Sequence, residues 1–177
     1  VIIDVHAHIM PGTDEDAAGL FRAECLREGV RLAIVSSVGD WSRYPDSETV
    51  RAANESIRGE AEKLGVLVRW LAYLNPQNAD WPEELARCLA AGAVGVKLWV
   101  SLKNAEGGLD ETTALIRHAG EKRLPVLVHT FNRTGPNLPG EADSAEFARL
   151  AARCPDTTLI GAHAGCGWRQ GLGALRE

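Results

Sequence analysis

The stretch Ile2-Ile3-Asp4-Val5-His6-Ala7-His8 opens the chain and decides its fold. Side chains in a β-strand alternate between its two faces, so His6 and His8 point the same way. Neutral imidazole is a common ligand for zinc and similar ions. An apolar strand that ends in two histidines of equal parity therefore predicts a metal site at the carboxyl end of that strand.

Two further histidines also end apolar, strand-like runs. His129 follows Pro125-Val126-Leu127-Val128, and His163 follows Thr158-Leu159-Ile160-Gly161-Ala162. In a barrel of parallel strands the carboxyl ends form a ring, and inward side chains meet at its centre. An open doubly wound sheet does not require such strands to converge, and no GxGxxG motif follows the first strand. The histidines therefore favour a barrel.

The rest of the chain alternates between strand-like and helix-like segments with a unit of roughly 30 residues, as in βαβ folds. The strand-like runs are nearly continuous apolar stretches, typical of parallel strands buried on both faces. We predict an α/β fold of the (β/α)8 TIM-barrel type, with six βα units present in this chain and the last two missing. The predicted strands are 2–8, 31–37, 67–74, 94–100, 125–129 and 158–163, and the predicted helices are 17–28, 47–64, 81–91, 111–122 and 144–153.

Local signals support the helix boundaries. Asp80 with Glu83, and Asp143 with Glu146, stand at the N-cap and N3 spacing of a capping box. Gly65 provides a stop for the second helix. Three tryptophans away from the strand ends are interpreted as packing aromatics: Trp41, Trp70 and Trp81.

Composition restricts the class of protein. The 177 residues are enough for one domain with a sizeable core. The 19 basic and 24 acidic residues are interspersed and give a net charge of -5, which argues against a nucleic-acid or anionic-membrane partner. No apolar run is long enough for a membrane span, and no signal-peptide pattern opens the chain. The four cysteines form no CxxC pair, so we expect reduced thiols and a cytoplasmic location.

Four segments carry a family resemblance. They are Ile3-Asp4-Val5-His6-Ala7-His8, Gly95-Val96-Lys97-Leu98, Pro125-Val126-Leu127-Val128-His129-Thr130 and Leu159-Ile160-Gly161-Ala162-His163-Ala164-Gly165. Together they resemble the amidohydrolase superfamily, in particular its branch of metal-dependent TIM-barrel hydrolases. That branch also contains decarboxylases related to aminocarboxymuconate-semialdehyde decarboxylase. The resemblance covers almost the whole chain in order.

The resemblance implies one barrel domain over residues 1–177. Because the chain starts on a strand at Val1 and stops at Glu177 inside a helix-like segment, we expect a fragment that is truncated at its C-terminus. The superfamily also implies an aspartate at the end of the eighth strand, which is not among these residues. Asp4 lies deeper on the first strand and is a poor substitute.

The histidines have predicted roles. His6, His8 and His129 could supply three protein ligands and leave a position for water, which is the layout of a catalytic metal site. His163 could act as a general acid or base. The resemblance implies the same roles and one divalent metal ion, with Zn²⁺ as the first choice and Mn²⁺ or Fe²⁺ as alternatives.

Four other residues are candidate substrate contacts. Lys97 ends the fourth strand, where it would face the pocket and pair with a substrate carboxylate or a buried acid. A core lysine paired with a neighbouring strand fits equally well, and a carboxylated lysine that bridges two ions is a third interpretation. Trp99 would make the pocket apolar. Arg133, in the long loop 131–142, could bind a carboxylate bidentately or be a solvated arginine. Trp168 would line the pocket or cover the barrel's edge.

Three functions fit these residues. The first is a metal-dependent hydrolase that uses metal-activated water on a small carbonyl substrate: an amide, lactone or ester. The second is a non-oxidative decarboxylase on the same scaffold, and the third is an inactive truncated barrel. The sequence does not choose between the first two, because both need the same ligands and a fold does not determine a reaction. A small molecule is the expected partner, and superfamily members often dimerise, so a homo-oligomer is a further expectation.

Overall fold

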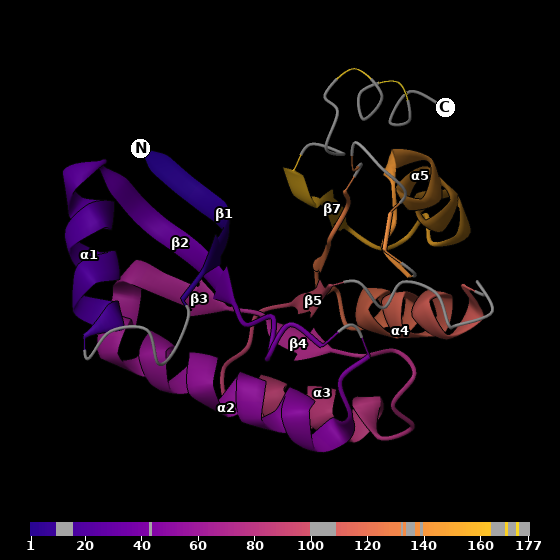
Figure 1. Cartoon of the computed structure of the whole chain (residues 1–177), viewed down its shortest axis with the longest axis horizontal. Coiled ribbons are helices and arrows are strands. Elements are labelled where there is room, and N and C mark those ends of the chain that lie inside the picture. Colours follow the sequence, from indigo (N-terminus) through magenta and orange to yellow (C-terminus); the bar gives the residue numbers. More distant parts are fainter. Residues whose placement is uncertain are drawn as a thin grey trace.

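The structure is a computed structural model that describes residues 1–9, 16–42, 44–99, 109–131, 133, 137–138, 140–163, 169 and 173. These residues form an α/β fold in which strands and helices alternate (Figure 1). The strands are β1 (Ile2–His8), β2 (Val30–Ser36), β3 (Val68–Trp70), β4 (Ala72–Leu74), β5 (Val96–Leu98), β6 (Val126–Val128) and β7 (Leu159–Gly161). The helices are α1 (Ala17–Arg27), α2 (Ser47–Leu64), the 3-10 helix η1 (Gly65–Leu67), α3 (Trp81–Ala90), α4 (Asp110–Glu121) and α5 (Ser144–Arg153).

Every strand pair is parallel, and the strands lie side by side in chain order. β1, β2 and β3 form one sheet, and β4 to β7 form the other. Only Leu71 separates β3 from β4: its backbone N–H donates to Val35 at 2.9 Å, whereas that of Ala72 donates to Gly95 at 2.9 Å. The segment 68–74 is therefore one barrel strand that joins the two sheets. The helices lie on the outside of this curved arrangement (Figure 1), which confirms the predicted fold class.

Helix boundaries follow the local sequence. α2 and α5 have the predicted bounds, and α2 ends at Leu64 with Gly65 as its C-cap, at a φ of 60°. Asp143 and Glu146 form the predicted capping box at α5. The capping box predicted at α3 is wrong: the side chain of Asp80 makes no cap and instead accepts a hydrogen bond from the hydroxyl of Ser47. The Asp80 carboxylate therefore binds a residue of α2 instead of capping α3, as the local sequence pattern had predicted.

The core has two parts. The larger cluster packs the strands against the surrounding helices and includes Val35, Leu74, Val96 and Val128. The smaller cluster combines Leu71, Leu127 and Ala162 with partly buried Ile34 and Ile160. Because Leu127 lies two residues before His129 and pairs with Ile160, the smaller cluster belongs to the strand face from which His129 extends. The apolar side chains of the smaller cluster thus lie on the same strand face as His129, one layer deeper in the barrel.

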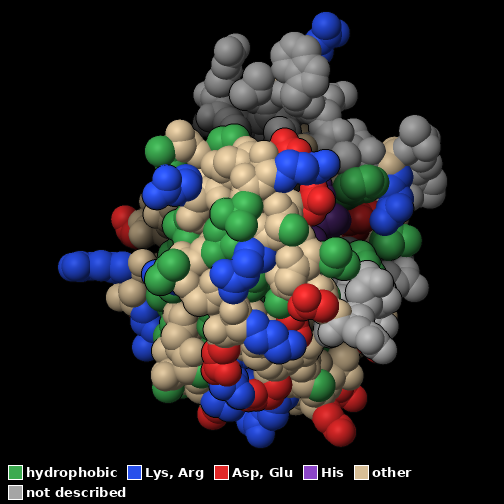
Figure 2. Space-filling model, turned by 90° about the vertical axis from the view of Figure 1, so that its left-hand side faces the viewer, with side chains coloured by type: hydrophobic (Ala, Val, Ile, Leu, Met, Phe, Trp, Pro, Cys, Tyr) green, Lys and Arg blue, Asp and Glu red, His purple; other side chains and the backbone are tan. Residues whose placement is uncertain are grey.

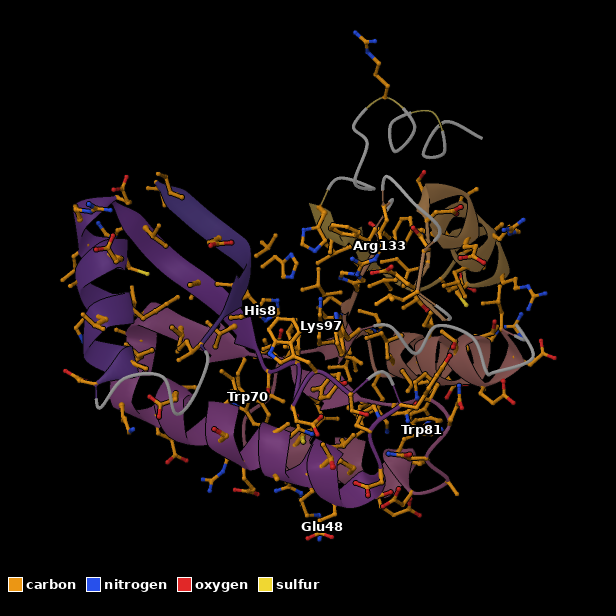
Figure 3. All side chains as sticks on the ribbon, viewed as in Figure 1. His8, Glu48, Trp70, Trp81, Lys97 and Arg133 are labelled. Atoms are coloured by element: carbon orange, nitrogen blue, oxygen red, sulfur yellow. The ribbon has the colours of Figure 1, made fainter. Side chains whose placement is uncertain are left out.

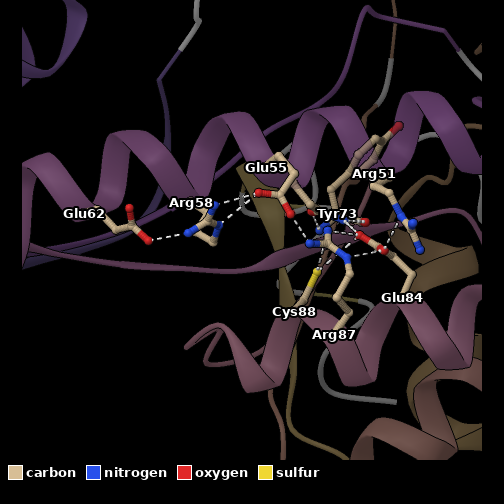
Figure 4. Close-up of polar contacts among 9 residues, drawn as sticks. Arg51, Glu55, Arg58, Glu62, Tyr73, Glu84, Arg87 and Cys88 are labelled. Carbon is tan, nitrogen blue, oxygen red and sulfur yellow. Dashed lines mark hydrogen bonds and ion pairs between the residues drawn. The ribbon is translucent and has the colours of Figure 1, made fainter.

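A buried polar network attaches α2 and α3 to β4 (Figure 4). Asn54 is fully buried; its amide nitrogen donates to the Tyr73 carbonyl at 2.9 Å and to Glu84 at 2.8 Å, and its amide oxygen accepts from the Tyr73 N–H at 2.8 Å. Arg87 donates two further hydrogen bonds to Glu84, at 2.8 and 2.7 Å. Asn54 therefore provides hydrogen bonds to the Tyr73 backbone, which lies beyond the part of the 68–74 strand that pairs with β2.

On the face shown in Figure 2, the described basic and acidic side chains are interspersed. Within the described residues, no helix combines the length and apolar character that crossing a membrane requires.

The Asn54 network generates a stability prediction. Asn54→Ala leaves the Tyr73 N–H and the Tyr73 carbonyl without their side-chain partner and removes one of the donors to Glu84 Oε1, which keeps its hydrogen bond from Arg87. We expect the free energy of unfolding to fall by about 2–4 kcal/mol, because each unsatisfied buried group costs roughly 1–3 kcal/mol. Urea titration followed by circular dichroism measures this change. Glu62→Gln, on the exposed face of the same helix, is the control and should leave the midpoint unchanged; an equally small effect of Asn54→Ala would contradict the role of the network.

Candidate functional site

The carboxyl ends of four barrel strands bring the predicted site residues together. His6 and His8 come from β1, Lys97 from β5, His129 follows β6 and His163 follows β7. The ring centroids of His6 and His8 lie 4.9 Å apart, those of His6 and His163 4.9 Å, and those of His129 and His163 5.2 Å. We call these four residues the histidine cluster. In the view of Figure 3, His8 and Lys97 lie between β1 and β7, with Arg133 nearer to β7.

His6 and His8 direct the same ring nitrogen at each other. Their Nε2 atoms lie 3.1 Å apart. The Nδ1 atom of His8 lies 2.9 Å from the Ser36 carbonyl oxygen, its register partner on β2. A carbonyl oxygen only accepts hydrogen bonds, so Nδ1 of His8 carries the ring proton. The lone pair of His8 is therefore on Nε2, facing His6.

This pair fits two ligands of one divalent ion. Zn–N bonds of about 2.0–2.1 Å place two tetrahedral ligand nitrogens roughly 3.3–3.4 Å apart, close to the 3.1 Å separation here. Metal-ligating histidines usually donate their other N–H to a carbonyl or carboxylate, as His8 does to Ser36. Among the described residues, no group of three or more His, Cys, Asp or Glu side chains is arranged to hold a metal. The role of His129 as third ligand stays a prediction.

Burial keeps the imidazoles neutral at neutral pH. Desolvation, with a smaller contribution from Lys97, lowers the pKa of His6 to about 3. Desolvation also lowers the pKa of His129 to about 4, against an opposing hydrogen bond to Glu141. The pKa values of His8 and His163 are lowered as well, again chiefly by desolvation. Each ring therefore has one nitrogen with a lone pair that can bind a metal or accept a proton.

Lys97 lies beneath the cluster rather than at an open surface. Its side chain is completely buried, and its Nζ atom lies 3.3 Å from Nε2 of His6. Burial lowers its pKa to about 7, and no acid among the described residues forms an ion pair with it. A partly neutral amine repels a nearby metal ion less than a full ammonium does. Its predicted contact with substrate stays a prediction.

Arg133 is directed toward a buried acid. Its Nε and Nη2 atoms donate to the two carboxylate oxygens of Glu141 at 2.8 and 3.1 Å. Glu141 is 2% exposed and also contacts Nε2 of His129 at 3.2 Å. Burial alone would raise the pKa of Glu141, but hydrogen bonds from Arg133, Leu138 and His129 outweigh it and hold that pKa below its usual range. The bidentate grip predicted for a substrate carboxylate is thus made to Glu141.

Two tryptophans line one side of the cluster. Trp99 is nearly buried at the end of β5, with its ring centroid 6.4 Å from that of His129. Trp41 lies edge-on to Trp99 at 5.4 Å and is 59% exposed, so its interpretation as a packing aromatic is wrong. The loop after β2 presents it at a φ of 67° instead of directing it into the core. Trp168 lies outside the described residues.

Three residues of this site were not assigned roles from the sequence: Ser36, Glu141 and Trp41. Ser36 had a usable signal, because it ends the strand that neighbours β1 and pairs with His8. Glu141 had no such signal in the sequence, because its contact with His129 depends on the path of the loop between β6 and α5. Histidine side chains reach the surface between hydrophobic and acidic ones on the face in Figure 2.

His163 has an unusual backbone. Its φ is 56°, in the left-handed region that costs L-residues energy. Its ring nevertheless contacts both His6 and His129. Strain of this kind is found at functional sites, where the surrounding structure imposes it. At this position it places an exposed imidazole beside the half-buried His6 and the buried His129.

Comparisons with known proteins identify one matching family. A family model described as amidohydrolase matches residues 3–177. No curated protein sequence matches the chain.

Solved structures share the fold at low sequence identity. An amidohydrolase II is 18% identical, with a TM-score of 0.64 over 98% of this chain and 72% of its own. A protein described as an amidohydrolase from Staphylococcus aureus is 14% identical, with a TM-score of 0.65 over 92% and 67%. A 2,6-dihydroxybenzoate decarboxylase in complex with 2,6-dihydroxybenzoate is 20% identical, with a TM-score of 0.65 over 94% and 69%. At these identities the likeness concerns the fold alone.

The strained backbone at His163 predicts an inverted substitution order. His163→Gly should be more stable than His163→Ala by about 1 kcal/mol, because glycine adopts the left-handed region without a steric cost. At His118, inside helix α4, the same pair of substitutions should show the opposite order, because glycine destabilises helices by about 1 kcal/mol relative to alanine. Thermal and urea unfolding of the four variants measure both orders. A more stable alanine variant at position 163 would contradict the left-handed conformation.

Proposed function

The chain belongs to the amidohydrolase family, and we propose that it is a metal-dependent hydrolase of a small carbonyl substrate: an amide, lactone or ester. The convergence of the His6 and His8 Nε2 atoms, with the Ser36 carbonyl setting the tautomer of His8, carries this proposal. These two residues would hold one divalent ion, with His129 as a third ligand. Zinc is the first choice because imidazole donors suit it, with Mn²⁺ or Fe²⁺ as alternatives.

The chemistry divides between the ion and the side chains. When bound, such an ion polarises a carbonyl oxygen and makes water a stronger acid. His163 is neutral and exposed, so one of its ring nitrogens can accept a proton from the attacking water and later pass it to the leaving group. Its ring contacts His6 and His129, which keeps this proton transfer beside the ligands. His163 is therefore the proposed catalytic acid and base.

The surroundings of the cluster favour hydrolysis over decarboxylation. Beside the metal ion, a decarboxylase would use a side-chain cation to hold the carboxylate that is lost. Arg133 directs its guanidinium at Glu141, and Lys97 is buried beneath His6. The exposed ring of Trp41, which lies edge-on to Trp99, would instead offer an apolar surface to the part of the substrate next to the carbonyl. A neutral acyl substrate therefore fits this site better than an anionic one.

Metal binding is the first test. His8→Ala removes one of the two converging nitrogens, and we expect zinc affinity to fall by more than about 100-fold, because outer-shell partners alone are worth roughly 10- to 100-fold. Zinc titration of the metal-free protein and metal analysis of the purified protein measure this loss. His118→Ala, which removes the histidine outside the cluster, is the matched control and should bind like the wild type. Activity in a wild-type protein that contains no metal would contradict the proposal.

The reaction class is tested by the fate of solvent oxygen. A panel of small amides, lactones, esters and carboxylic acids is incubated with the zinc-loaded protein in water enriched in heavy oxygen. We expect label in the carboxylate of the product and a kcat reduced by at least 100-fold in His163→Ala, since general acid–base catalysis contributes roughly 10²–10⁴-fold. Carbon dioxide release with an unlabelled organic product would replace hydrolysis by decarboxylation.

A further inference from the structure

Glu141 is a buried acid that the loop after β6 returns to the side of His129. The Phe131 N–H donates to the Ala142 carbonyl at 2.8 Å, which brings the end of this loop back to the strand from which it leaves. One carboxylate oxygen of Glu141, Oε1, lies 3.2 Å from Nε2 of His129 and accepts from Arg133 at 3.1 Å. The other, Oε2, accepts from Arg133 at 2.8 Å and from the Leu138 N–H at 3.0 Å.

This hydrogen-bond pattern defines which groups carry protons. Three N–H groups, two from Arg133 and one from Leu138, donate to the two oxygens of Glu141. A carboxylate held by a guanidinium fork in this way is ionised and acts only as an acceptor. The remaining contact, with Nε2 of His129, is therefore a hydrogen bond that the histidine donates. A neutral imidazole has one N–H, so the lone pair of His129 is on Nδ1.

We propose that Glu141 is a positioning residue that holds His129 in the Nε2–H tautomer, so that His129 offers Nδ1 to the metal. The part that concerns the metal rests on the proposed function, whereas the tautomer does not. His8 is held in the opposite tautomer by Ser36 and offers Nε2. Two different hydrogen-bond acceptors thus set the tautomers of two proposed ligands of one ion: a backbone carbonyl for His8 and a buried carboxylate for His129.

The ring of His129 is also held on its face. Phe131 stacks on it with ring centroids 5.9 Å apart and an interplanar angle of 7°. The guanidinium carbon of Arg133 lies 5.0 Å from the centroid of the Phe131 ring. Arg133 therefore contacts both Glu141 and Phe131, the two groups that orient His129. In this arrangement its charge neutralises Glu141, a different role from the predicted binding of a substrate carboxylate.

Glu141→Gln should invert the tautomer. Both carboxylate oxygens receive two donors: Oε1 from Arg133 and His129, and Oε2 from Arg133 and Leu138. The donors at Oε2 keep their protons, whereas the proton of His129 can move to its other ring nitrogen, so the amide oxygen of a glutamine belongs at Oε2 and its NH₂ displaces the 3.1 Å contact of Arg133 with Oε1. The amide NH₂ then takes the Oε1 position and faces Nε2 of His129 as a donor. His129 can accept that hydrogen bond only if its proton moves to Nδ1, which removes the lone pair proposed for the metal.

The test reads the ring nitrogens of His129 directly. Nitrogen NMR of the metal-free full chain, labelled with ¹⁵N-histidine, distinguishes protonated from unprotonated ring nitrogens, and His129→Gln assigns the signals. We expect a protonated Nε2 and an unprotonated Nδ1 in the wild type, and the reverse in Glu141→Gln. Glu84→Gln, which alters another buried glutamate bound by an arginine, is the matched control and should keep the wild-type tautomer. A wild-type His129 with its proton on Nδ1 would overturn the inference even if no variant folds.

Zinc titration separates this inference from the proposed function. We expect Glu141→Gln to bind zinc about 10- to 100-fold more weakly than the wild type, the usual effect of losing an outer-shell partner, and Glu84→Gln to bind like the wild type. The expected tautomer in a wild type that binds no zinc would uphold the positioning of His129 and overturn the metal proposal. Zinc binding that is equally strong in wild type and Glu141→Gln would overturn the role of Glu141.

Discussion

Parallel strand pairing is the constraint on which the site depends. Because every pair of neighbouring strands runs in the same direction, all carboxyl ends lie at one edge of the curved sheet. A residue two positions further along a strand stays on the same face. These two rules bring His8 beside Ser36 and carry His129 and His163 to the same rim. Residues more than 150 positions apart, such as His6 and His163, thus come into ring contact.

The strands bring the imidazoles together, but other groups decide what each imidazole offers. Ser36 sets which nitrogen of His8 has the lone pair, and burial keeps the rings neutral. Glu141 contacts His129 from a loop, and an imposed left-handed backbone directs His163. The last two have an energetic cost, because one is a buried carboxylate and the other a strained residue. Their gathering around one cluster supports the proposed metal site over a chance group of histidines.

The sequence predicted the parts of the fold that depend on periodicity and local caps. The HxH parity of β1, the bounds of α2 and α5, and the capping box at Asp143 depend on neighbours in sequence. It did not predict what depends on contacts between distant segments. The break at Leu71 arises because the strand changes partners between β2 and β5, and Asp80 is taken by Ser47 on another helix. Trp41 and Glu141 lie in loops, whose paths no hydrophobic period describes.

The proposed function requires that His6 and His8 converge on one cation at this rim. The most direct measurement is the anomalous scattering of zinc in crystals of the zinc-loaded protein. We expect a peak at about 2.0–2.1 Å from the Nε2 atoms of both residues. A zinc peak away from this pair, or His6 and His8 rings that point in different directions in those crystals, would contradict it.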